Sequence, residues 1–187
     1  MSSNKSTLRS ELVKPGLIRA ICVFHPQICN GISGTVVFTE MTSKKQTKKR
    51  NSKPPTIEIT VELDGVPPGD HGFHIHETGN LLDKCVSCKA HFNPFGEVHG
   101  GLKSKHRHVG DLGNITANAD GKVRMKLRDT MIQLRGEKSN IIGRSLVIHE
   151  KEDDLGMTVG NPESLINGLA GARIACAVVG YADAYYF

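Results

Sequence analysis

The chain has 187 residues, the length of one domain that can bury a stable core of its own. Aromatic residues make up only 5% of it, tryptophan is absent, and 20 glycines and 8 prolines give a turn-rich composition that argues against long helices. The formal net charge is +5, and the sequence shows neither an apolar run of membrane-spanning length nor the apolar stretch of a secretory signal. We therefore expect a cytoplasmic chain without membrane contact.

In chain order, short β-rich runs separated by turn residues dominate the sequence. Residues 56–63 and 122–128 alternate strictly between apolar and polar side chains, the pattern of a strand with one wet face. Asp120-Gly121 is a strong hairpin signal between two such runs. The remaining predicted strands are 18–24, 32–40, 71–76, 115–118, 144–149 and 174–180. Eight short strands predict an all-β fold, an antiparallel sandwich or barrel.

The positive charge belongs to one segment between the second and third predicted strands. Residues 42–55 contain no acidic side chain, and without their six cations the formal net charge would fall from +5 to −1. These cations are Lys44, Lys45, Lys48, Lys49, Arg50 and Lys53. The run is typical of a solvated loop insertion; the alternatives are a contact with a nuclear import factor, which would add a nuclear location, and an arm that binds polyanions.

Two long stretches, 77–113 and 150–171, do not alternate and are predicted to be functional loops. Histidines lie in and beside them. His74 and His76 project from the same face of one predicted strand, and His149 ends another, so three imidazoles can meet. A site made of imidazoles alone suits copper or zinc better than magnesium or calcium.

The first of these loops adds three imidazoles and a carboxylate. His91, His99, His108 and Asp111 form a set that suits a tetrahedral zinc site. His91 is the nearest of them in sequence to the strand histidines and could serve two metals, one through each ring nitrogen. The alternative is a single structural zinc with surplus surface histidines.

Several of these segments resemble the copper–zinc superoxide dismutases, and the resemblance runs from about residue 18 to residue 180. The matching motifs are 72–77, 91–94, 99–101, 108–114, 142–150, 153–156 and 170–176. The resemblance implies a Greek-key β-sandwich, an architecture that this family shares with other sandwich domains. It implies one domain over 18–187, with the basic insertion at 42–55, after a flexible segment at 1–17.

By this resemblance the chain would disproportionate two superoxide anions to oxygen and hydrogen peroxide, cycling Cu(II) and Cu(I) beside a structural zinc. Copper would be held by His74, His76, His91 and His149. Zinc would be held by His91, His99, His108 and Asp111, with His91 as the bridge. The alternative function is that of a non-enzymatic copper- and zinc-binding relative, a metal chaperone or a redox-signalling partner.

The resemblance also assigns residues around the metals. Asp153 would tie His74 to His99, and Arg173 would dock the superoxide anion beside the copper. Cys85 and Cys176 would form the disulfide, although Cys88 makes a Cys-x-x-Cys sequence that could form a competing disulfide or a thiol metal site. A homodimer and loading by a copper chaperone are further implied.

Four positions in the second long loop depart from the family's pattern. Met157, Pro162 and Ile166 stand where charged residues are usual, and Leu169 replaces a common asparagine. Fewer charges on the approach to the copper predict weak electrostatic steering of superoxide.

Overall fold

The computed structural model describes residues 18–41 and 54–182. The predicted flexible segment 1–17 and all but the last two residues of the basic insertion lie outside these ranges, as do residues 183–187. None of the helices within the described part is long and apolar enough to cross a membrane.

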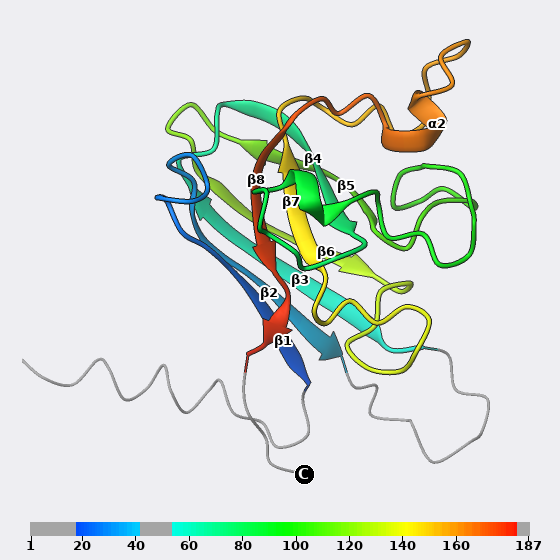
Figure 1. Cartoon of the computed structure of the whole chain (residues 1–187), viewed down its shortest axis with the longest axis horizontal. Coiled ribbons are helices and arrows are strands. Elements are labelled where there is room, and N and C mark those ends of the chain that lie inside the picture. Colours follow the sequence, from blue (N-terminus) through cyan, green and yellow to red (C-terminus); the bar gives the residue numbers. More distant parts are fainter. Residues whose placement is uncertain (1–17, 42–53, 183–187) are drawn as a thin grey trace, which may run out of the picture.

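Two antiparallel sheets face each other across one core (Figure 1). The five-stranded sheet has the order β6-β3-β2-β1-β9, with β6 Val123–Asp129, β3 Thr56–Asp64, β2 Ser33–Met41, β1 Arg19–Phe24 and β9 Gly180–Tyr181. The four-stranded sheet has the order β5-β4-β7-β8, with β5 Asp111–Ala117, β4 Gly69–His76, β7 Ser145–His149 and β8 Arg173–Val178.

The alternation in the sequence sets which side of each strand enters the core. In β3, Ile57, Ile59, Val61 and Leu63 are fully buried, and the polar residues between them face outward. They pack in the same cluster as apolar residues of the second sheet, including Phe73 of β4. Burial of apolar surface is the main stabilising contribution here, at about 25 cal/mol per Å².

The connections cross between the sheets in the Greek-key manner. β3 pairs with β6 and β4 pairs with both β5 and β7, so consecutive strands repeatedly leave one sheet for the other. The predicted all-β antiparallel sandwich is confirmed. Short helical turns, η1 Val86–Cys88 and α2 Ser164–Asn167, interrupt the two long loops.

Most strand boundaries lie within two residues of the prediction, and two predicted strands differ in a more important way. β5 begins at Asp111, four residues earlier than predicted, because a register shift between Gly72 and His74 lets His74 pair with Asp111. The last predicted strand divides at Val179, where β8 has ended and the two-residue β9 crosses to the edge of the other sheet beside β1.

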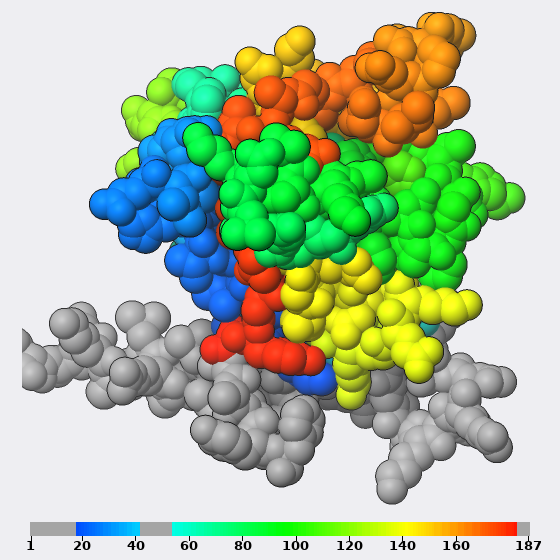
Figure 2. Space-filling model, viewed as in Figure 1, coloured from blue at the N-terminus to red at the C-terminus, as the bar shows by residue number. Residues whose placement is uncertain are grey.

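The first long loop is tied to β8 by a disulfide between Cys85 and Cys176, whose Cα atoms lie 5.7 Å apart. Among the described residues Cys22, Cys29 and Cys88 are free and buried. The disulfide implied by the family resemblance is therefore confirmed, and the competing Cys85–Cys88 bridge is absent from this structure. In Figure 2 the two long loops, green and orange, gather on the same face of the molecule.

Candidate metal centre

Four histidines converge at the end of the second sheet, and we call them the strand-side group: His74, His76, His91 and His149. β4 supplies the first two, β7 supplies His149, and an isolated antiparallel bridge to His76 brings in His91 from the loop. All four are at most 5% exposed, and their ligand nitrogens lie within 4.8 Å of one another.

In the strand-side group, outer hydrogen bonds determine which ring nitrogen faces the centre. His74 uses Nε2 to contact Asp153 Oδ2 at 2.8 Å. His76 and His149 use Nδ1, which donates to the carbonyl oxygens of Lys89 at 2.8 Å and Gly171 at 3.2 Å. A nitrogen that donates outward leaves the other with a free lone pair, so each ring offers one acceptor to the shared space. The Nε2 atoms of His76 and His149 lie 3.2 Å apart.

A second set surrounds one carboxylate, and we call it the loop-side group: His91, His99, His108 and Asp111. The Nδ1 atoms of the three histidines lie 2.9, 3.1 and 3.1 Å from Asp111 Oδ1. Asp111 Oδ2 accepts the backbone N–H groups of Gly100 and His108, which fixes the carboxylate. On this side, the ligand atoms that lie within 4.8 Å of one another belong to His74, His91, His99 and Asp111, so His74 takes the place of His108 in that set.

His91 belongs to both groups. Its Nδ1 is turned to Asp111, and its ring lies 4.0 Å from that of His74 and 5.0 Å from that of His76, centroid to centroid. One imidazole therefore lies in both the strand-side group and the loop-side group.

Asp153 links the two groups from outside. Its Oδ2 contacts Nε2 of His74 at 2.8 Å and its Oδ1 contacts Nε2 of His99 at 2.7 Å, in a position that is 1% exposed. The Asn114 side chain holds the Asp153 backbone through two hydrogen bonds. Gly168 closes over this carboxylate with φ of +67°, and a Cβ there would lie 2.0 Å from Asp153 Oδ1. Only glycine meets both requirements.

Two buried ring nitrogens, Nδ1 of His74 and Nδ1 of His99, have no hydrogen-bond partner. His99 Nδ1 lies 3.1 Å from Asp111 but lacks hydrogen-bond geometry. An unsatisfied buried polar atom costs about 1–3 kcal/mol, which a metal ion at that nitrogen would remove. Six imidazoles and one carboxylate are the donor set that copper and zinc prefer, so the residues fit these metals.

The two groups hold their protons differently in the absence of metal. Burial lowers the pKa of His74, His76 and His91, and lowers that of His149 to about 4, so these rings are neutral. Burial also acts against the His99 cation, but the adjacent carboxylates of Asp111 and Asp153 outweigh it and raise the pKa of His99 to about 9.

A cavity of about 650 Å³ opens onto the strand-side group, with His76, His91 and His149 at its base. Arg173 lines it, and its guanidinium donates to the backbone carbonyls of Cys85 at 2.7 Å, Val86 at 3.2 Å and Lys89 at 2.5 Å. The cation is thus held in one orientation beside the histidines.

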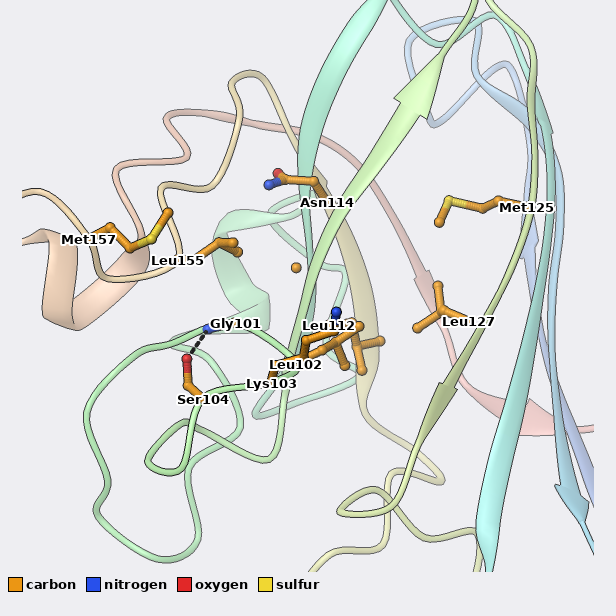
Figure 3. Close-up of a pocket in the computed structure, with 11 residues that line it drawn as sticks. Gly101, Leu102, Lys103, Ser104, Leu112, Asn114, Met125, Leu127, Leu155 and Met157 are labelled. Carbon is orange, nitrogen blue, oxygen red and sulfur yellow. Dashed lines mark hydrogen bonds between the residues drawn. The ribbon is translucent and has the colours of Figure 1, made fainter.

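The lining of this cavity corrects part of the sequence interpretation. Ile166 and Leu169 line it as expected, but Met157 does not: it lies in a second, largely apolar cavity of about 560 Å³ between the loops and β6 (Figure 3). Lys151 and Glu163 also line the first cavity, and neither was expected from the sequence. Lys151 could have been found from its position in the sequence, two residues after His149.

Comparisons with known proteins agree with this geometry. Residues 32–179 match the family model described as copper/zinc superoxide dismutase. The chain is 49% identical over 183 residues to a superoxide dismutase [Cu-Zn] of Paramecium bursaria Chlorella virus 1, covering 97% of this chain and 86% of that protein. It is 43% identical to an extracellular superoxide dismutase [Cu-Zn] of Brugia pahangi, covering 92% and 80% of the two chains.

A further relative and a solved structure extend the comparison. Superoxide dismutase [Cu-Zn] 5 of Dictyostelium discoideum is 44% identical, covering 86% of this chain and 95% of that one. The crystal structure of the clock protein EA4 superposes with a TM-score of 0.75 at 38% identity, covering 87% and 93%. The chain belongs to the copper/zinc superoxide dismutase family, with copper and zinc as its cofactors and superoxide as its substrate.

Proposed function

We propose that the strand-side group holds the copper ion and the loop-side group holds the zinc ion of this superoxide dismutase. The observation that carries the proposal is the direction of the ring nitrogens. Outer hydrogen bonds leave Nδ1 of His74 and Nε2 of His76 and His149 turned to one point. The three loop-side Nδ1 atoms surround Asp111 Oδ1.

When bound, copper would supply the one-electron chemistry and zinc would supply fixed positive charge on the shared imidazole. The chain's own residues then divide the remaining work. His91 is anchored through Nδ1 on the loop side, so its Nε2 can hold a proton at the strand side and release it to a reduced oxygen species. Asp153 keeps His74 and His99 in the required tautomers.

Arg173 is proposed to dock the anion. Its charge persists at all ordinary pH values, and three backbone carbonyls hold its guanidinium at the cavity wall that also contains His76, His91 and His149. A fixed cation needs no reorganisation when the substrate arrives, so it favours a small anion beside the copper histidines.

The test is to measure metal content and superoxide decay on the same purified sample. We expect one copper and one zinc per chain and decay much faster than the uncatalysed reaction. Absence of decay with both metals bound would support the alternative, a non-enzymatic metal-binding relative.

Zinc binding to the metal-free protein at about pH 7.5 is expected to release close to one proton. His99 is protonated below its pKa of about 9, and zinc needs the lone pair of its Nδ1. The raised pKa of His99 also stabilises the metal-free fold below pH 6.5, and this contribution is lost as the pH rises through 9. Titration calorimetry in buffers of different ionisation enthalpy measures the release; an equal release above pH 9 would contradict the assignment.

Lys151→Gln is expected to lower kcat/KM a few-fold at low ionic strength and to flatten its salt dependence, because steering by a single cation is screened by salt. Lys151 lines the cavity together with the oppositely charged Glu163, so the steering of the unmodified protein should be modest. Ile166→Lys should raise the low-salt rate. Lys126→Gln, on β6 and 65% exposed, is the matched control and should change nothing. Equal salt slopes in all three variants would count against steering by Lys151.

We further propose that the chain forms a homodimer. Support for a homodimer comes from exposed apolar side chains at the β1, β8 and β9 edge, namely Val23, Val178 and Tyr181. Light scattering on the purified chain decides this. Loading by a copper chaperone, a polyanion or import-factor contact through the basic insertion, and a cytoplasmic location rest on the sequence alone, and one relative named above carries "extracellular" in its name.

A further inference from the structure

Three cysteines lie in one buried cluster where the first long loop is joined to β8. Cys85, Cys88 and Cys176 form a small buried cluster with Val147, separate from the main core. The first and last are joined as a disulfide, and Cys88 is a free thiol with no exposed surface. Nothing in the metal centre uses this thiol.

The local backbone places Cys88 on the same side of its turn as Cys85. Residues Val86–Cys88 form one 3₁₀ turn that starts at Cys85, and the N–H of Cys88 donates to the carbonyl of Cys85 at 3.4 Å. In a 3₁₀ turn the side chains at positions i and i+3 eclipse each other. The Cys88 thiol is therefore on the side from which Cys85 forms its disulfide.

We propose that Cys88 is an internal exchange partner of the disulfide, so that the chain has two disulfide isomers. The Cys88 thiolate attacks Sγ of Cys85, a Cys85–Cys88 bond forms, and the Cys85–Cys176 bond breaks. The electron pair leaves on Sγ of Cys176, which takes up the proton that Cys88 gave. The number of disulfides and thiols is unchanged, so the step needs no external oxidant or reductant.

Exchange would displace Arg173, the cation that docks the superoxide anion, and this consequence rests on the proposed function. The carbonyls that hold Arg173 belong to Cys85, Val86 and Lys89, which are the exchanging turn and the residue that follows it. The Lys89 carbonyl also accepts from Nδ1 of His76. A bridge inside the turn would free the loop from β8 and move these carbonyls, so the second isomer would have a misplaced Arg173 and lower activity.

Cys29 provides a matched comparison. It is also buried and free, and its thiol donates to the backbone carbonyl of Cys176 at 3.4 Å. It belongs to the main core, however, and not to the sulfur cluster. Cys29→Ser removes a thiol near the same strand without removing the proposed exchange partner.

The first experiment follows the isomers in the metal-loaded full chain at about pH 8, where an ordinary thiol is partly ionised. Samples are quenched in acid, denatured, alkylated with iodoacetamide and digested with trypsin, which cuts after Lys84, Lys89 and Arg173. The starting isomer joins peptide 85–89 to peptide 174–187 and carries the alkyl group on Cys88. The exchanged isomer has a bridge within peptide 85–89 and the alkyl group on Cys176.

We expect the exchanged isomer to grow with time in the unmodified chain and in Cys29→Ser, and its peptides to be absent from Cys88→Ser. Superoxide decay should fall with the exchanged fraction while metal content stays constant. No exchanged peptide in the unmodified chain would overturn the proposal, as would its loss in Cys29→Ser. A failure of the dismutase function would look different, since all variants would then lack decay whatever their peptides.

The second experiment keeps the proposal testable if Cys88→Ser folds poorly. Cys176→Ser is treated with oxidised glutathione, a disulfide oxidant, under native conditions with metal content checked. We expect peptide 85–89 to be recovered two hydrogens lighter, with its internal bridge. Recovery of that peptide carrying glutathione, or still reduced, would show that the two sulfur atoms cannot meet and would overturn the proposal.

Discussion

His91→Ala is expected to disturb both metal ions at once and to lower activity by at least about 100-fold, since even the outer partners of metal ligands typically contribute 10- to 100-fold. The expectation rests on one ring that contacts Asp111 through Nδ1 and lies among His74, His76 and His149 through its other edge. Removing it takes a ligand from each group. The unfolding temperature of the metal-loaded protein should fall as well, because metal binding free energy adds to folding free energy.

The measurement is metal content, the copper absorption spectrum and unfolding temperature on one sample. His106→Ala is the matched control, because His106 is exposed, pairs with Glu97 and lies in the same loop outside both groups. It should retain both metals. An unchanged copper spectrum with full zinc occupancy in His91→Ala would rule out a shared imidazole.

Arg173→Ala is expected to lower kcat/KM roughly 10- to 100-fold, the range for losing one charge-assisted contact to the substrate. Copper and zinc content should persist, since the hydrogen bonds that hold the Arg173 guanidinium are to backbone carbonyls of the loop. Arg173→Lys keeps the charge but cannot satisfy three carbonyls at once, so it should recover only part of the rate.

The rate of superoxide decay, measured against salt concentration, separates the contribution of the Arg173 charge from that of its fixed orientation. Arg124→Ala serves as control, because Arg124 pairs with Asp64 on the five-stranded sheet and its side chain is 48% exposed. An Arg173→Ala variant with normal kcat/KM and intact metals would show that the anion is held by another group.

Inhibition by small anions also tests whether Arg173 docks the substrate. If Arg173 docks the substrate, an anion that competes with superoxide should bind more weakly to Arg173→Ala than to the unmodified chain, while the unfolding temperature changes little. Equal inhibition in both would place the anion elsewhere in the cavity that Lys151 and Glu163 also line.

Sequence alone determined the β architecture and the residue types of the metal centre. Alternation is a local property of the chain, so Ile57, Ile59 and Val61 could be assigned to the core before any partner strand was known. The histidine pair on one strand and the carboxylate-containing set in the loop likewise pointed to copper and zinc through donor chemistry. The family resemblance supplied the disulfide partner of Cys85, which composition and spacing left open.

Only the tertiary structure decided which ring nitrogen of each histidine faces the metal centre. The nitrogen that His74 turns inward depends on Asp153, 79 residues away, and that of His76 depends on a backbone carbonyl 13 residues away, at Lys89. A backbone carbonyl has no signature in sequence, because every residue carries one. The same limit applies to Lys151 and Met157, since a loop's path determines which of its side chains lines a cavity, and that path follows from packing between segments distant in the chain.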